Sequence, residues 1–255
     1  MSAWSWLQAP EAKKLTVPAA VLVHMQVQLV RTSRLRTLWP WLAVMLAVTL
    51  GGWAIVRFSV EASERFADYV HTWGVRAIAL VALGLGTAAV RQDAEAGALS
   101  FFLLRPQAKI ALPIGRWLAV TLVAGVLGEL SMLLLWLVTR GTSAEMAVVD
   151  LPPLLLAAAL AAATYSATFL AIAIWFRAAV GMSVGWLVVL DRLATQSTSF
   201  AVIAPSHYLA TILGEESPPE TTVPMAVLAL LGWTALMLVA AAVRLQREPP
   251  SMQRT

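Results

Sequence analysis

The stretch RQDAEAGALSFFLLRPQAKIALPIGR, residues 91–116, joins two long apolar runs of the chain and carries charges at both ends. Its centre, Ala98 to Leu104, is amphipathic, and we expect Pro106 and Pro113 to break any helix there. A segment of this kind lies flat at a membrane surface, with its apolar side in lipid and protein. We therefore predict that it receives force from another subunit. A passive amphipathic loop resting on lipid is the alternative.

Composition places the chain among membrane proteins. Of its 255 residues, 60% are hydrophobic and 13% are charged, whereas an ordinary soluble domain has about 25% charged residues. A spanning helix needs roughly 20 mostly apolar residues. We therefore predict one all-α, polytopic transmembrane domain over residues 1–255. The six expected spans are about 38–58, 72–90, 117–138, 154–176, 178–204 and 223–243.

Two segments depart from a regular span. Residues 17–36 have apolar positions at helical spacing, but polar side chains interrupt them, so we expect an interfacial helix rather than a span. A soluble amphipathic helix is the alternative. Its basic end carries Arg31, Arg34 and Arg36. In the fifth span, the polar residues 191–199 interrupt the apolar sequence, and such residues are tolerated at depth only where protein or water covers them. We predict a broken or re-entrant fifth helix.

The distribution of Lys and Arg gives the orientation. The segments before span one, between spans two and three, between spans four and five, and after span six hold thirteen of the eighteen basic residues, and the opposite side holds four. The positive-inside rule then places both termini and the 91–116 stretch in the cytoplasm. The expected location is a bacterial inner or plasma membrane. We read the +4 net charge loop by loop, and expect no nucleic-acid partner.

In this cytoplasmic stretch the chain resembles the permease subunits of type-2 ABC exporters. Those permeases carry an acidic residue followed by Gly-Thr-Leu, then paired leucines, a proline, a basic residue, and a glycine-basic pair that opens span three. The matching residues here are Glu95-Ala96-Gly97-Ala98-Leu99, Leu103-Leu104, Pro106, Lys109 and Gly115-Arg116. Ala98 replaces the usual threonine, which removes a helix-capping hydroxyl.

The resemblance implies half of a transporter that moves its substrate outward. A second permease, either an identical copy or a paralogue, would complete the path. The 91–104 segment would be a coupling helix seated on an ABC ATPase subunit. No G-x-x-x-x-G-K-[ST] loop occurs, so ATP and Mg²⁺ would belong to that separate chain and this chain would bind no cofactor. The coupling residues would be Arg91, Asp93, Glu95, Gly97, Leu99, Phe102, Leu103, Pro106 and Lys109.

Part of this assignment has a physical reason apart from the resemblance. Asp93 and Glu95 precede the apolar run, and negative charge favours a helix N-terminus. Gly97 would allow a partner backbone to approach closely. The aromatic and leucine side chains of 101–104 offer more apolar surface than a solvated loop keeps exposed.

Three charged residues are expected at depth in the membrane. Glu129 in span three and Asp191 in span five lie at similar depth, so either of them could pair with Arg192. One hypothesis is a gate or substrate path, and the other is a charge pair that holds the broken helix in place. The same residues would serve an ion- or proton-coupled carrier or an intramembrane enzyme, which are the alternatives to a permease. A membrane anchor or assembly scaffold is a third possibility. We expect no metal site, because the three histidines are scattered.

Overall fold

The protein is described by a computed structural model that covers residues 16–59, 62–95, 108–140, 150–191, 201–214 and 221–247. Regular structure in these ranges is helical throughout. Within these ranges, five helices are long and apolar enough to cross a membrane, which confirms a polytopic helical membrane protein. These candidate spans are Leu35–Phe58, Thr72–Asp93, Lys109–Val138, Leu151–Trp175 and Val223–Arg247.

Short helices and turns connect or precede these spans. The α-helices are α1 (Val17–Thr32), α2 (Leu35–Phe58), α3 (Ala62–Tyr69), α4 (Val75–Glu95), α6 (Ala108–Arg140), α7 (Leu151–Trp175), α8 (Ala179–Gly185), α10 (Pro205–Ile212) and α11 (Val223–Arg247). A π-helical turn, Val70–Gly74, joins α3 to α4, and another, Trp186–Asp191, extends α8. A 3₁₀ turn, Ala201–Ile203, precedes α10.

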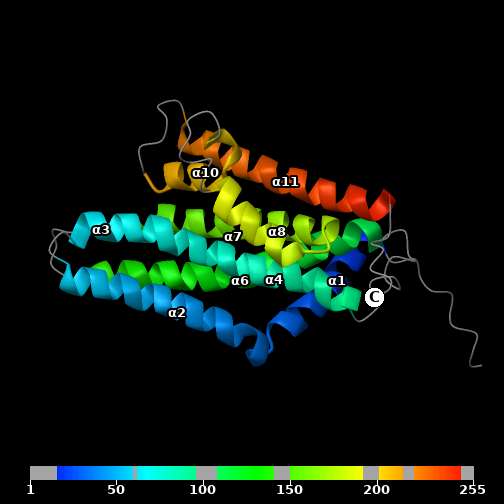
Figure 1. The fold of residues 1–255 in the computed structure, drawn as a ribbon, viewed down its shortest axis with the longest axis horizontal. Helices are drawn as coiled ribbons and strands as arrows, with labels where there is room; N and C mark the ends of the chain where they lie inside the picture. The colour runs from blue at the N-terminus through cyan, green and yellow to red at the C-terminus, as the bar shows by residue number, and fades with distance from the viewer. Residues whose placement is uncertain are drawn as a thin grey trace, which may run out of the picture.

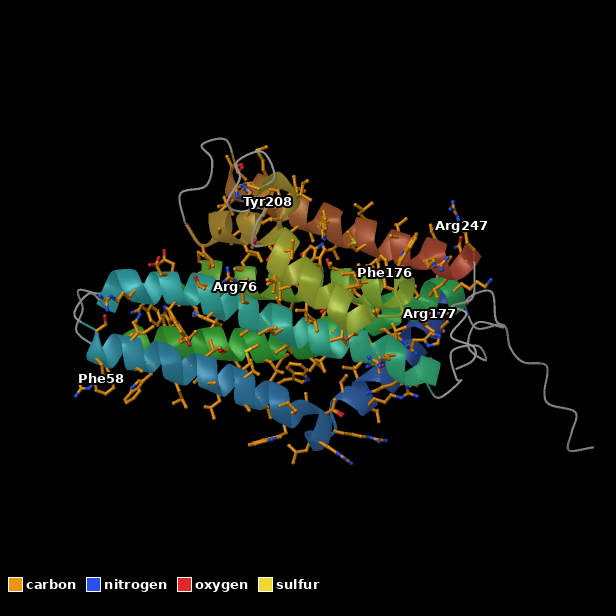
Figure 2. The ribbon with its side chains drawn as sticks, viewed as in Figure 1. Phe58, Arg76, Phe176, Arg177, Tyr208 and Arg247 are labelled. Atoms are coloured by element: carbon orange, nitrogen blue, oxygen red, sulfur yellow. The ribbon has the colours of Figure 1, made fainter. Side chains whose placement is uncertain are left out.

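The long helices lie side by side along the longest axis of the molecule (Figure 1). We name the ends of this bundle by residues that lie there. Phe58 lies at one end, which we call the Phe58 end. Arg177 and Arg247 lie toward the opposite end, which we call the Arg247 end (Figure 2). The last turn of α4 and the first turn of α6 also lie at the Arg247 end (Figure 1).

Helix α7 forms the centre of the bundle, packed against α4, α6 and α11. It is apolar around its whole circumference, as expected of a helix enclosed on all sides. Ala157, Ala158, Ala161 and Ala162 are fully buried on it. Small side chains of this kind let neighbouring helix backbones approach closely, which is how helices associate without a hydrophobic driving force in lipid.

The fifth expected span is interrupted in the structure. Helix α8 and its π-helical extension are described as far as Asp191, whose carboxylate accepts a hydrogen bond from the backbone N–H of Ser206. A continuous helix would hold these two residues, fifteen positions apart, about 22 Å from each other. Residues 192–200, which include Arg192, lie outside the described residues, and the chain is next described at the 3₁₀ turn and α10. The predicted 178–204 span is therefore not one continuous helix.

The boundaries of the first helix differ from the sequence prediction. The expected 17–36 helix ends at Thr32, whose hydroxyl bonds back to the Gln28 carbonyl, and Arg34 is extended. Helix α2 then begins at Leu35, so Arg31 belongs to α1 whereas Arg36 lies in the first turn of α2. Helix α1 packs along α6 far more extensively than against α2.

The ends of the 91–116 stretch also differ from the prediction. Helix α4 continues through Arg91 to Glu95, and α6 already begins at Ala108. Pro113 does not break the helix but lies inside α6. A proline this close to a helix start removes one backbone hydrogen bond, and the remaining turns continue past it. Residues 96–107 lie outside the described residues.

Candidate functional site

The predicted coupling residues fall into two groups in the structure. Asp93 and its neighbours Arg91 and Glu95 lie in the last turn of α4, and Lys109 is the second residue of α6. The remaining ones lie outside the described residues: Gly97, Leu99, Phe102, Leu103 and Pro106. Asp93 therefore lies in the last turn of a spanning helix, and its predicted role at the start of a coupling helix stays a prediction.

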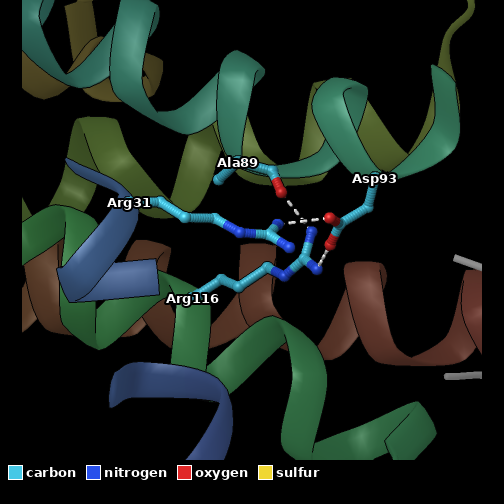
Figure 3. A network of polar contacts seen from close by, with 4 residues as sticks. All are labelled: Arg31, Ala89, Asp93 and Arg116. Carbon is cyan, nitrogen blue, oxygen red and sulfur yellow. Dashed lines mark hydrogen bonds and ion pairs between the residues drawn. The ribbon is translucent and has the colours of Figure 1, made fainter. Parts of the chain in front are cut away.

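Asp93 lies at the centre of an ion cluster formed by three helices (Figure 3). Arg31 of α1 donates from Nη1 to Oδ1 of the carboxylate. Arg116 of α6 pairs through Nη2 with Oδ2, and its Nη1 donates to the carbonyl of Ala89, one turn before Asp93. We call Arg31, Asp93 and Arg116 the ion cluster. It joins the end of α4, the start of α6 and helix α1.

The two ion pairs of Asp93, which we call the Arg116 arm and the Arg31 arm of the ion cluster, differ in burial. The side chains of Asp93 and Arg116 are 2% and 3% exposed, whereas that of Arg31 is 35% exposed. A buried ion pair has a high desolvation cost, so removing one partner leaves an uncompensated charge and is strongly destabilising. The Ala89 carbonyl offsets part of this cost for Arg116. The Asp93–Arg116 arm is therefore the stronger structural constraint, and the Arg31 arm is screened by solvent.

Close packing beside the cluster holds α1 against α6. A Cβ atom at Gly115 would lie 2.5 Å from the carbonyl oxygen of Val21 and 3.0 Å from the backbone nitrogen of Met25. The absence of a side chain at Gly115 thus sets the distance between the two helices. His24 lies at the same crossing, where burial and then the nearby charge of Arg116 lower its pKa.

The geometry constrains the connection between spans two and three at both ends. Its entry at Asp93 and its exit at Arg116 are paired with each other, and Arg31 adds the interfacial helix to the same point. The sequence contained Arg116 within the glycine-basic pair, but its partner was not predicted. The sequence did contain a signal for this pairing: an acidic residue in the last turn of one span and a basic residue in the first turns of the next.

Asp191 lies in a second polar site, at the end of the π-helical extension of α8. Its Oδ2 accepts a hydrogen bond from the Tyr165 hydroxyl at 2.9 Å, and its Oδ1 accepts one from the backbone N–H of Ser206 at 3.1 Å. The Ser206 hydroxyl donates to the Asp191 carbonyl at 3.2 Å. Asp191 is only 4% exposed. This carboxylate satisfies a free N–H in the first turn of α10 across the interruption, so it fastens α10 to α8 and α7.

Aromatic side chains fill the space beside Asp191. Trp186 contacts the rings of Tyr165 and Phe169 with centroids 6.1 and 5.9 Å apart, and it lies 6.3 Å from Trp233 of α11. The Trp233 indole donates to the hydroxyl of Thr168 at 3.0 Å. The interrupted fifth element is thus held in the bundle core in two ways: Trp186 packs against aromatic rings of α7 and α11, and Asp191 forms hydrogen bonds.

Glu129 is not part of this site. It lies on an exposed face of α6, whereas the described partners of Asp191 are Tyr165 and Ser206. The predicted pairing of either acid with Arg192 stays a prediction, because Arg192 lies outside the described residues. The two acids for which the sequence predicted a similar depth therefore lie in different surroundings: Glu129 is exposed on α6 and Asp191 is buried.

A scan against protein-family models finds none that matches this chain, and a search of curated proteins finds no match either. Within the described ranges, no three His, Asp or Glu side chains gather in a way that could hold a metal ion. The chain is a multi-span helical membrane protein with an ion cluster at the Arg247 end and a buried carboxylate site at the interrupted fifth element.

Proposed function

We propose that the chain is the transmembrane permease subunit of an ATP-driven exporter and that a separate ATPase subunit docks on the connection between α4 and α6. The observation that carries this proposal is the buried Asp93–Arg116 pair at the base of that connection. Both termini and the Arg247 end would face the cytoplasm, by the positive-inside rule. ATP and Mg²⁺ would be bound by the ATPase subunit.

The ion cluster suits the transmission of force because it makes the base of the connection rigid. A push on residues 96–107 reaches the bundle through the last turn of α4 and the first turns of α6. Since Asp93 and Arg116 pair with each other, the two helices would move as a unit rather than separate. Arg31 and the Gly115 crossing add α1 to this unit, so an amphipathic helix at the membrane surface would move with it.

The interrupted fifth element supports the same proposal from inside the bundle, where Asp191 bonds Tyr165 near the middle of α7. The π-helical turn Trp186–Asp191 and the return of the chain to Asp191 at Ser206 give irregular backbone at depth, which is tolerated where protein or a water-filled path covers it. A second permease would cover this face. The substrate would then move outward between the two subunits.

The experiment that tests this proposal is co-purification. The full chain is expressed with a tag in its own host and purified in mild detergent, and the sample is assayed for a bound subunit and for ATP hydrolysis. The test variant is Leu99→Asp with Phe102→Asp, which places charge on the apolar side of the proposed docking segment. Val148→Asp with Val149→Asp, in the connection between α6 and α7, is the matched control.

The proposal expects an ATP-hydrolysing subunit to co-purify with the wild type and the control, and to be lost from the 99/102 variant. If no such subunit co-purifies with the wild type, or if the 99/102 variant retains it fully, the proposal is wrong.

An ion- or proton-coupled carrier is the second candidate, and the buried carboxylate of Asp191 favours it. Such a carrier needs a titratable group inside the bundle. The discriminating result is transport by the purified chain alone in vesicles, driven by an ion gradient without ATP and abolished by Asp191→Asn. Transport that needs the ATPase subunit contradicts this candidate.

A further inference from the structure

One face of α6 is apolar and exposed along most of its length, with an acidic residue within it. Leu122, Val126, Leu130 and Leu134 are 50%, 50%, 52% and 47% exposed. Glu129 is exposed on the same face, since these positions follow the helical repeat of three and four residues. We call this surface the Glu129 face.

Contacts with α2 place Glu129 well inside the membrane. Ser131, two residues further along α6, shares a hydrogen bond of 3.2 Å with Thr49 of α2. Thr49 lies near the middle of α2, nine residues before Phe58. At about 1.5 Å per residue, Glu129 is also about 13 Å from Val138, the last residue of its span. Its carboxylate is therefore not at the water interface.

An ionisable side chain at such depth is costly when it faces lipid, and it normally faces protein or water and finds a partner. No described residue bonds the Glu129 carboxylate or pairs with it. The arginines Arg57 and Arg140 lie in the last turns of α2 and α6, near the ends of their spans. A partner from another protein would have to reach the middle of the membrane and present a positive charge or a strong hydrogen-bond donor.

We propose that the Glu129 face binds a transmembrane helix of a different protein that carries a lysine or arginine at mid-depth. The apolar residues above and below Glu129 fit the leucine-rich surface of such a helix, and the carboxylate fixes its register through one charged contact. A second copy of this chain fits less well, because a two-fold contact centred on the face would set one Glu129 against the other. This inference does not depend on an ATPase driving the chain.

The test measures helix association in lipid vesicles by fluorescence energy transfer. The chain contains no cysteine, so Asp150→Cys at the exposed start of α7 gives a single position for the donor dye. The probes are acceptor-labelled synthetic transmembrane helices of about 22 Leu and Ala residues. One has a single arginine at its midpoint and the other has leucine there. The binding of each probe is measured for three full-length donor-labelled chains: one without further change, one with Glu129→Leu, and a control with Asp68→Asn. Asp68 is an exposed acid in α3.

We expect the arginine helix to bind the donor chain and its Asp68→Asn version about tenfold more tightly than the leucine helix does, in line with polar contacts between membrane helices. Glu129→Leu should abolish that preference. Equal binding of the two helices, or a preference that survives Glu129→Leu, overturns the proposal. Unfolding transitions of the three chains are compared, and Glu129→Leu should unfold no earlier, because leucine is suited to a lipid-facing position.

Two further measurements separate the other possible occupants. Energy transfer between donor- and acceptor-labelled copies of the chain, weakened by Glu129→Leu in the absence of any probe, would show that a second copy covers the face and would overturn the proposal. Reaction of Glu129→Cys with a membrane-impermeant thiol reagent would show a water-filled path there, and would overturn it as well. The proposal expects neither result.

Discussion

Replacement of Asp93 by asparagine removes the carboxylate that Arg31 and Arg116 share in the ion cluster. The substitution keeps the shape of the side chain and removes its charge. Arg116, whose side chain is 3% exposed, then keeps neutral acceptors such as the Ala89 carbonyl but has lost its negatively charged partner. An uncompensated buried charge of this kind typically costs about 3–5 kcal/mol of unfolding free energy.

The same structure predicts a much smaller loss of unfolding free energy when the ion pair between Arg31 and Asp93 is removed. Arg31 is 35% exposed at its side chain, so solvent screens its pairing with Asp93. Arg31→Gln should cost about 0–1 kcal/mol, the range of exposed ion pairs. The double variant Asp93→Asn with Arg116→Met removes both buried charges together. It should be more stable than Asp93→Asn alone by about 2 kcal/mol, because a well-packed apolar side chain replaces the unpaired guanidinium.

The assay is reversible unfolding of the purified full chain in mixed micelles, driven by increasing denaturing detergent. Eleven tryptophans give a strong fluorescence signal, and helix content is followed in parallel. Each variant is compared with the wild type at the same lipid-to-detergent ratio.

Two results would refute the reasoning. Equal destabilisation by Asp93→Asn and Arg31→Gln would show that burial does not separate the two arms. Additive effects of Asp93→Asn and Arg116→Met would show that these two residues do not interact in the folded protein.

Three further predictions concern the α1 crossing and the interrupted helix. Gly115→Ala should lower unfolding free energy by about 1–3 kcal/mol in the same detergent assay, because its Cβ would overlap the α1 backbone, whereas Gly232→Ala, which meets nothing within 4 Å, should change it little. Burial lowers the pKa of His24 below its ordinary 6.5, so its neutral form favours the folded state. Its contribution is present above pH 6.5 and is lost as the pH falls toward the lower folded-state pKa, so the wild type should lose more stability between pH 8 and pH 5 than His24→Gln does. Asp191→Asn should weaken the attachment of α10, which hydrogen exchange would detect as faster exchange of the Ser206 amide with little change in α7.

The long spans could be predicted from sequence because membrane insertion depends on a local property, the length of an apolar run. Leu35–Phe58 and Lys109–Val138 contain the predicted 38–58 and 117–138 spans. The interruption near Asp191 was also predictable, since a polar run inside an apolar one is visible without any tertiary information. Helix ends were placed less well, because charged residues mark the edge of the bilayer and the helices continue beyond it, as α4 does to Glu95.

The partners of the charged residues could not be predicted, because those residues lie far apart in the chain. Asp93 is separated from Arg31 by 62 residues, and Asp191 from Tyr165 by 26. Depth counted along each helix placed Glu129 and Asp191 at one level, but it did not give the direction in which either side chain points. Helix α6 is apolar on all sides, so its sequence carries no periodicity that distinguishes its buried face from its exposed one.

The sequence by itself determined that this chain spans a membrane several times and that its fifth apolar segment is interrupted, because hydrophobicity and its breaks are local. Only the tertiary structure decided that Asp93 is a buried bridge between α4, α6 and α1, and that Glu129 faces outward. The physical reason is that the side of a helix that becomes buried depends on which neighbours pack against it. In lipid, where apolar residues suit both faces, composition does not record that choice.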